Sequence, residues 1–277
     1  MKIFVTRKIH ESGINMLKKA GHTVTIYPKD KIIPRIKLLK SVKGCDAVLS
    51  LLTDRINEEV FQAAGKNLKI VANFAVGFDN IDLEAAKKHN IIATNTPSDK
   101  VNESVAEHTF ALMLALARRI PEADHFAKRG QYKGWSPTLL TGSDVYNKTL
   151  GIIGAGRIGG MTARRGVLGF GMKLLYTNPS RNPILEKELG AKKVSQTELL
   201  KKADFISLHV PLLPSTTHLI SDKEFALMKP TAFLINTARG PIVHEKALLK
   251  ALKAKRIAGA GLDVFECEPA IDCDLRD

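Results

Sequence analysis

The stretch LGIIGAGRIGG, residues 150–160, decides the fold of this chain. Within it Gly154, Gly156 and Gly159 have the spacing GxGxxG, directly after an apolar run and at the start of a helical pattern. The first glycine allows a tight turn, the second lets the backbone approach a pyrophosphate, and the third permits close helix packing. The stretch therefore predicts a dinucleotide-binding turn. The alternative is a tight strand-to-helix turn that binds no ligand.

Short β-branched runs alternate with amphipathic helical stretches on both sides of this turn, which predicts βαβ units and parallel sheets. We expect strands at 2–6, 23–27, 47–52, 68–74 and 91–95, with helices at 11–20, 31–42, 56–65 and 82–89. A second series of strands is expected at 149–153, 173–177, 205–210, 232–237 and 258–264. The chain is therefore expected to be an α/β protein with two doubly wound parallel-sheet domains, the first flavodoxin-like and the second a Rossmann domain.

The domain boundary is expected near residue 98, with a first domain at 1–98 and a dinucleotide-binding domain at 99–277. The second domain begins with a long helix at 102–119, in which Asn102 is expected to be the N-cap and Arg118 and Arg119 to lie at the C-terminal end. This helix is apolar nearly all round, so we expect it to be buried between the domains.

The 277 residues contain 42 Lys and Arg against 28 Asp and Glu, a formal net charge of +14. The basic residues are scattered as doublets through helical stretches, which is typical of solvated surfaces. Since the chain lacks a nucleic-acid recognition motif and an aromatic platform, we expect no nucleic-acid partner. No apolar run is long enough to span a bilayer, so no membrane partner is expected. The 3 cysteines are widely spaced without a metal-ligand pattern, which favours the reducing cytoplasm and no metal site.

The end of the second strand after the glycine turn, LLYTNPSRN, predicts which dinucleotide binds. NAD-binding sites usually place Asp or Glu there to accept from the ribose 2′-hydroxyl, whereas this chain has Asn178. A neutral amide removes repulsion against a 2′-phosphate, and Ser180 and Arg181 supply donors to it. We therefore predict NADP(H) rather than NAD(H). The alternative is that Asn-Pro simply forms a turn.

Two later strands end in polar groups, at the edge where open α/β sheets bind ligands. The run FLINTARG carries Thr237 and Arg239, and the run AGAGLDVFECEP carries Asp263 and Glu268. An arginine in a strand-end loop is usually solvated. This one follows a wholly apolar strand and precedes Gly240, so we expect its side chain near the nicotinamide end of the cleft.

With these motifs the sequence resembles the D-isomer-specific 2-hydroxyacid dehydrogenase family, and within it the glyoxylate and hydroxypyruvate reductases. The resemblance extends from Lys2 to the last residues. Its motifs are VGFDNID at 76–82, NESVAEHT at 102–109, GIIGAGRIG at 151–159, NTARG at 236–240 and GLDVFECEP at 261–269. The last two motifs and their spacing make the assignment specific.

The resemblance implies a homodimeric oxidoreductase that transfers hydride between NADP(H) and a small 2-oxo acid, glyoxylate or hydroxypyruvate. It implies that Arg239 binds the carboxylate or carbonyl of the substrate, and that backbone N–H groups of Val76 and Gly77 bind the carboxylate. Glu268 would be the carboxylate of a catalytic His–Glu pair, in which it orients the imidazole and raises its pKa. The cofactor-binding residues so implied are Gly154, Gly156, Arg157, Ile158, Gly159, Asn178, Ser180, Arg181, Thr237, Ala238 and Asp263, the last near the nicotinamide amide.

The chain departs from the family at its catalytic histidine. That histidine lies after Glu268 in a segment close to Thr-Pro-His, and residues 269–277 contain none. We expect none of the 8 histidines to replace it: His108 is expected to be structural, and His244 to cap a helix. We therefore expect a C-terminally truncated chain with impaired activity, an apolar groove on the first domain and a solvent-exposed Glu268. Losing a general acid slows a reaction by about 10²- to 10⁴-fold.

Two hypotheses of function remain open at this point. The first is an NADP-dependent 2-hydroxyacid dehydrogenase whose activity in this form is impaired. The second is a catalytically silent NAD(P)-binding protein that works through regulation or interaction. The missing histidine favours the second hypothesis, whereas Arg239, Glu268 and the pair Val76 and Gly77 favour the first, since a silent site need not keep them.

Overall fold

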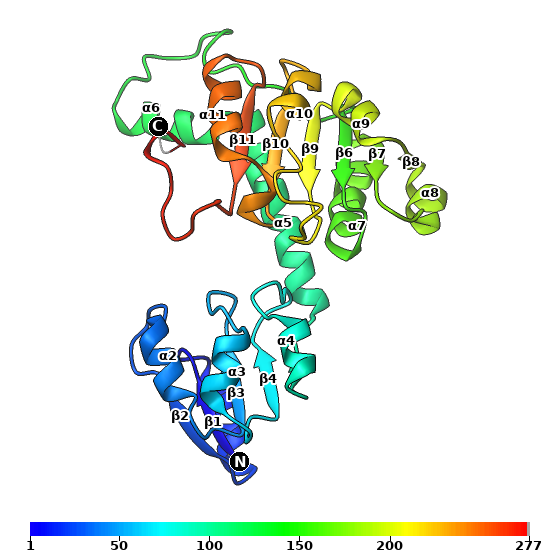
Figure 1. The fold of residues 1–277 in the computed structure, drawn as a ribbon. Helices are drawn as coiled ribbons and strands as arrows, with labels where there is room; N and C mark the ends of the chain where they lie inside the picture. Colours follow the sequence, from blue (N-terminus) through cyan, green and yellow to red (C-terminus); the bar gives the residue numbers. More distant parts are fainter. Residues whose placement is uncertain (276–277) are drawn as a thin grey trace. The chain divides into compact units, whose positions relative to one another are not determined.

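The computed structural model describes residues 1–275, and it divides into two compact units at Ser98 and Asp99. In the first unit five parallel strands form one sheet in the order β2-β1-β3-β4-β5 (Figure 1). This order is that of flavodoxin-like proteins, so the predicted fold class is confirmed for this unit. The strands are β1 (Lys2–Val5), β2 (Thr23–Ile26), β3 (Ala47–Ser50), β4 (Ile70–Asn73) and β5 (Ile92–Thr94), and the helices are α1 (Glu11–Lys19), α2 (Arg35–Ser41), α3 (Glu58–Ala64) and α4 (Leu83–Lys88).

Alternating side chains explain how the helices cover this first sheet. Phe4 and Val71 are buried on one face, in a core that α2, α3 and α4 share. Val5 points to the other face and packs in a core with α1. On that second face Ile92, which pairs with Ile70 across β4 and β5, is 61% exposed. The apolar groove expected on this unit stays a prediction.

The second unit contains a six-stranded parallel sheet in the order β11-β10-β9-β6-β7-β8. After β8 the chain returns to the opposite side of β6 to form β9, so the strand order reverses between β6 and β9. This arrangement confirms the predicted Rossmann fold, in which the short β8 is the third strand and was not predicted from the sequence. The strands are β6 (Thr149–Ile153), β7 (Lys173–Thr177), β8 (Lys192–Lys193), β9 (Phe205–Leu208), β10 (Phe233–Asn236) and β11 (Gly259–Leu262).

Helices cover both faces of this second sheet, where they form two apolar cores. The long helix α5 packs on β10 and β11, and also on α7. The helices are α5 (Asp99–Ala117), α6 (Ile120–Lys128), α7 (Arg157–Arg164), α8 (Pro183–Leu189), α9 (Gln196–Lys202), α10 (Asp222–Leu227) and α11 (Glu245–Lys253), with a π-helical turn η1 (Arg165–Gly169) and short 3₁₀ turns η2 (Gly240–Ile242) and η3 (Cys273–Leu275).

The helix α5 differs from the prediction at both ends. It begins at Asp99, whose acidic side chain is favourable in a first helical turn, so the prediction that Asn102 is the N-cap is wrong. Asn102 lies inside the helix and is 2% exposed. The helix ends at Ala117, and Arg119 has the left-handed φ of 55° and precedes α6. Because Ala111 is exposed, α5 buries one face rather than its whole surface.

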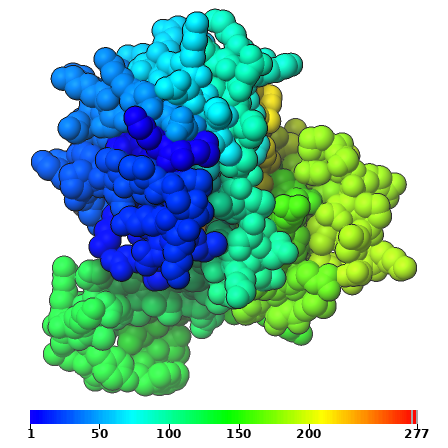
Figure 2. All heavy atoms as spheres, turned by 90° about the horizontal axis from the view of Figure 1, so that it is seen from below, coloured from blue at the N-terminus to red at the C-terminus, as the bar shows by residue number. Residues whose placement is uncertain are grey.

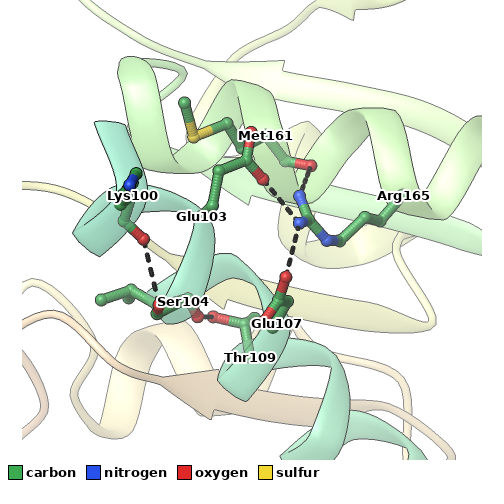
Figure 3. Close-up of polar contacts among 8 residues, drawn as sticks. Lys100, Glu103, Ser104, Glu107, Thr109, Met161 and Arg165 are labelled. Atoms are coloured by element: carbon green, nitrogen blue, oxygen red, sulfur yellow. Dashed lines mark hydrogen bonds and ion pairs between the residues drawn. The ribbon is translucent and has the colours of Figure 1, made fainter. Parts of the chain in front are cut away.

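Arg165 links α5 to the end of α7 (Figure 3). Its Nη2 lies 2.5 Å from Oε2 of Glu103 and 3.4 Å from Oε1 of Glu107, and its Nη1 donates to the carbonyl oxygen of Met161 at 3.2 Å. Glu103 and Glu107 are four residues apart on α5, so both can face one guanidinium group. At Arg165 the α-helix α7 becomes the π-helical turn η1, and these contacts hold that junction against α5.

The segment that follows α5 lies at the surface. The helix α6 contains no buried residue, and Trp135 in the loop after it is 83% exposed. Figure 2 shows this part of the chain, coloured green, at the surface of the molecule. Within residues 1–275 no helix has the length and apolar character needed to cross a membrane. The same residues contain no group of His, Cys, Asp and Glu side chains arranged to hold a metal ion.

Candidate active site

Three glycines shape the turn between β6 and α7, and each has different surroundings. Gly154 has a φ of +96°, and a Cβ there would lie 2.7 Å from the carbonyl group of His209 at the end of β9. A Cβ on Gly159 would lie 2.2 Å from the carbonyl oxygen of Gly154, so α7 can start this close to the turn only with glycine. A Cβ on Gly156 would meet nothing within 4 Å. The backbone at Gly156 therefore borders open space at a helix N-terminus, which fits a dinucleotide pyrophosphate.

The C-terminal end of β7 carries Asn178 at the position predicted to contact the ribose. The Asn178 amide nitrogen donates to the carbonyl oxygen of Ser180 at 3.2 Å and lies 3.4 Å from its Oγ. The Arg181 guanidinium binds the Glu186 carboxylate, with Nη2 2.7 Å from Oε2, and Glu186 also accepts from the Tyr176 hydroxyl at 2.5 Å. Arg181 and then Tyr176 lower the pKa of Glu186. The turn therefore presents an amide, a hydroxyl and an arginine that is paired with a carboxylate.

The turn after β10 is built by Asn236, which is 1% exposed. Its Nδ2 donates to the carbonyl oxygen of Arg239 at 2.9 Å, and its Oδ1 accepts from the backbone N–H of Ala238 at 3.1 Å. The buried Thr237 Oγ1 lies 2.9 Å from Oγ1 of Thr109 on α5. The Arg239 Nη1 donates to the carbonyl oxygen of Ala238 at 2.7 Å. These bonds determine the shape of the turn that carries the arginine.

The turns after β10 and β11 pack directly against each other. A Cβ on Gly240 would lie 1.9 Å from the carbonyl oxygen of Phe265, so this contact requires glycine. Glu245, at the start of α11, accepts through Oε1 from the backbone N–H of Glu266 at 2.6 Å. In return the backbone N–H of Glu245 donates to Glu266 Oε2 at 3.1 Å. Arg239 and Glu268, the side chains predicted to be catalytic, therefore lie on turns that pack against each other at Gly240 and are linked by two backbone-to-carboxylate hydrogen bonds.

Glu268 is exposed, as expected, and its Oε1 accepts from the backbone N–H of Phe265 at 2.8 Å. His218 reaches the same turn but contacts Glu266, with Nε2 2.6 Å from Oε1. Burial raises the pKa of Glu266, but a backbone N–H bond and His218 lower it, and the net direction is down. His244 is the N-cap residue of α11, as predicted, but its side chain makes no capping bond. Its ring lies 4.5 Å from that of His218.

His108 was predicted to be structural, yet it contacts a residue predicted to bind the cofactor. Its Nε2 lies 3.2 Å from Oδ1 of Asp263, and both side chains are about half exposed. Sequence reasoning missed this pair because the two residues are far apart in the chain. The signal in the sequence was the four-residue spacing of His108 from Leu112, which puts both on one face of a helix. The structure shows that this face packs against β11 at Gly261.

In the first unit, the turn after β4 carries Val76 and Gly77. The carbonyl oxygen of Ala75 accepts from the backbone N–H of Thr96 at 2.8 Å, and that of Val76 accepts from Nδ2 of Asn95 at 2.7 Å. In a trans peptide the C=O and the following N–H point in opposite directions. The N–H of Val76 therefore points away from Thr96, and the N–H of Gly77 points away from Asn95.

Comparison with known proteins identifies the family. The family described as "D-isomer specific 2-hydroxyacid dehydrogenase, NAD binding domain" matches residues 110–277. A glyoxylate reductase of Thermococcus kodakarensis is 50% identical over 278 residues, which cover 99% of this chain and 82% of that protein.

Solved structures agree with this match. The TT0316 protein of Thermus thermophilus has a TM-score of 0.90 at 40% identity, over 99% of this chain and 85% of that one. The D-lactate dehydrogenase of Aquifex aeolicus, solved with NAD and lactic acid, has a TM-score of 0.86 at 34% identity, over 100% of this chain and 84% of that one. The chain belongs to the D-isomer specific 2-hydroxyacid dehydrogenase family.

Proposed function

We propose that this chain is an NADP(H)-dependent reductase that interconverts glyoxylate or hydroxypyruvate with the corresponding 2-hydroxy acid. The observation that carries the proposal is the C-terminal edge of the second sheet. There the glycine turn follows β6, the turn with Arg239 follows β10, and Asp263 follows β11. Open α/β sheets bind ligands at this edge, beside the point where the strand order reverses.

For the cofactor, we assign the pyrophosphate to the N-terminus of α7, where the N–H groups of Arg157 and Ile158 begin the helix. Thr237, Ala238 and Asp263 are assigned to the nicotinamide end, with the Asp263 carboxylate accepting from the carboxamide. When bound, the nicotinamide supplies or accepts the hydride. The protein residues bind, orient and polarise the partners of that transfer.

For the substrate, we assign the carboxylate to Arg239, because a guanidinium group offers two parallel N–H donors to a carboxylate. We also assign to it the backbone N–H groups of Val76 and Gly77, whose peptide carbonyls are oriented by other partners. Glu268 is assigned to the proton-transfer step as the partner of a histidine.

We assign NADP(H) over NAD(H) from the end of β7. A carboxylate at position 178 would accept from a ribose 2′-hydroxyl and repel a 2′-phosphate, whereas the Asn178 amide does neither. The substitution Asn178→Asp is expected to lower the ratio of NADPH to NADH affinity by about tenfold or more, since it introduces one charge at this site. Measured dissociation constants for both dinucleotides test this. An unchanged ratio would remove the basis for the NADP(H) assignment.

The catalytic histidine of the family has no counterpart in residues 269–277. We therefore propose that a polypeptide of residues 1–277 binds cofactor and substrate but transfers hydride slowly. A catalytically silent NAD(P)-binding protein is the second candidate function. It is favoured by the side chain of His218, which contacts Glu266 instead of Glu268. Turnover measurements separate the two candidates.

We propose a homodimer, in which α5 and the loop around Trp135 contribute to the interface. An apolar groove of about 590 Å³ lies between α5 and η1. Its apolar lining residues are Phe110, Ala111, Leu114, Leu168 and Phe170. A monomeric mass in solution would contradict this proposal. The cysteine pattern supports the cytoplasm as the proposed compartment.

A further inference from the structure

We propose that His108 is a positioning residue for the cofactor, which holds the Asp263 carboxylate in the orientation that binds the nicotinamide carboxamide. The inference rests on the proposed function, because it takes from it the role of Asp263. It adds a residue of α5 that makes no assigned contact with cofactor or substrate. The Nε2 atom of His108 lies 3.2 Å from Oδ1 of Asp263, which is within ion-pair distance.

The contact is the third in a series of regularly spaced contacts between β11 and α5. A Cβ on Gly259 would lie 3.5 Å from Cδ2 of Leu116, and a Cβ on Gly261 would lie 3.1 Å from Cβ of Leu112. Each step of two residues along the strand advances about 6.6 Å, and each step of four residues back along the helix advances about 6 Å. Two residues beyond Gly261 the chain reaches Asp263, and four residues before Leu112 it has His108, so these two residues lie opposite each other.

Glycine on β11 is what lets the helix approach this closely. At Gly261 the helix side chains already lie at 3.1 Å from a Cβ that glycine lacks, so a larger residue would push α5 outward. A displaced α5 would carry the His108 imidazole out of contact with Asp263. Because the imidazole side chain is short, it can contact Asp263 only when α5 packs this closely on β11.

A neighbouring contact shows that α5 also holds the adjacent turn. Thr109, the residue after His108, places its Oγ1 2.9 Å from Oγ1 of Thr237, and both residues are buried. Consecutive residues of α5 thus contact the ends of β11 and β10. Both strand ends carry groups that we assign to the nicotinamide, so α5 fixes the position of these groups relative to each other.

The chemistry of the pair explains what the contact does. Asp263 is about half exposed, so without a partner its carboxylate can rotate and exchange between water molecules. With Oδ1 directed at His108, we assign Oδ2 to the N–H of the carboxamide. Bonds to a charged acceptor contribute more than neutral ones, and orientation determines how much of that contribution is realised.

The test compares two dinucleotides that differ only in this group. NADP⁺ carries the carboxamide, whereas 3-acetylpyridine adenine dinucleotide phosphate has a methyl group in place of the amide nitrogen and cannot donate to Asp263. Dissociation constants are measured by calorimetry for the wild-type chain, His108→Leu and His108→Gln. Glutamine can place an amide nitrogen near the position of Nε2, whereas leucine has no donor.

We expect His108→Leu to weaken NADP⁺ binding by about tenfold and to change binding of the acetylpyridine analogue by less than about twofold. His108→Gln is expected to retain most of the NADP⁺ affinity. Combining His108→Leu with Asp263→Asn should weaken NADP⁺ binding no more than Asp263→Asn does alone. Equal weakening of both dinucleotides by His108→Leu would show a merely structural role, and no weakening of either would also overturn the proposal.

His89 provides a matched control, because its Nε2 lies 2.8 Å from Oε1 of Glu58 in the first unit. His89→Leu removes a comparable His–carboxylate pair and is expected to leave both dissociation constants unchanged. Thermal unfolding of each variant identifies any that fails to fold, and His108→Ser then replaces His108→Leu. If the wild-type chain binds neither dinucleotide, the proposed function itself fails; if it binds both and the variants match it, only the role of His108 fails.

Discussion

At the scale of single residues, two glycines of the candidate active site have opposite roles. A Cβ on Gly156 meets open space, whereas a Cβ on Gly240 would overlap the backbone at Phe265. Gly156→Ala is therefore expected to leave the free energy of unfolding unchanged or slightly raised, and to weaken NADPH binding. Gly240→Ala is expected to destabilise the fold by about 3 kcal/mol or more. Urea unfolding and NADPH titration of both variants check this contrast, and equal effects on stability would contradict it.

His209 makes stability depend on pH. Burial lowers its pKa from 6.5 to about 4, and its Nε2 lies 2.8 Å from Ser207 Oγ. Because the unfolded chain binds the proton more readily, this contribution to stability is fully present above pH 6.5 and is lost as the pH falls towards 4. Between pH 7 and 5 we expect a loss of about 2 kcal/mol from this residue. His209→Gln should show a correspondingly smaller decrease in the free energy of unfolding, and an identical pH dependence would refute the assignment.

Residue types and spacing predicted much of the candidate site, but not the contacts between distant segments. The GxGxxG spacing was enough to predict the turn at Gly154, because the geometry of that turn is local. The pairing of His108 with Asp263 depends on tertiary packing, so sequence reasoning missed it. The pairing of Arg181 with Glu186 is local, since the two are five residues apart, but it depends on the conformation of the turn before α8. The individual roles of the site residues stay predictions that the experiments above address.

At the scale of elements, the packing of α5 on β11 makes a specific prediction. A Cβ at position 261 would lie 3.1 Å from Leu112 Cβ and from Leu116 Cδ1, tighter than ordinary contact. Gly261→Ala is therefore expected to destabilise the fold by about 1–3 kcal/mol. The control is Gly160→Ala in α7, where a Cβ would lie 3.7 Å from Leu185 and the higher helix propensity of alanine should stabilise slightly. A stabilising Gly261→Ala, measured by urea unfolding, would contradict this account of the packing.

Strands were predicted more accurately than the helix that joins the two series. The β-branched runs are short and bounded by polar residues, so β6 and β7 have the predicted limits of 149–153 and 173–177. The helix α5 starts three residues earlier than predicted, since Asp99 rather than Asn102 begins it. In the sequence, either Asp99 or Asn102 could lie at the start of the helix. The structure distinguishes them, because Asn102 is buried inside the helix. The helix α6 was not predicted, and it contains no buried residue.

At the scale of the whole molecule, the net charge of +14 fits a protein whose cofactor and substrate are both anions. Many of the basic side chains form ion pairs at the surface, as Arg164 does with Glu188 and Lys202 with Glu198. Exposed pairs of this kind contribute little to stability. The charge is therefore better understood as a property of the surface than as a determinant of the fold.

The measurement that tests the central claim most directly is the rate of glyoxylate-dependent NADPH oxidation at high enzyme concentration. It compares residues 1–277 with the same polypeptide extended by the histidine-bearing C-terminal segment of a relative, each with and without Arg239→Met. We expect slow, glyoxylate-dependent oxidation that the extension accelerates by about 10²- to 10⁴-fold and that Arg239→Met reduces by about 100-fold or more in both. Oxidation that does not depend on glyoxylate, that persists in Arg239→Met, or that stays absent in the extended polypeptide would contradict the account.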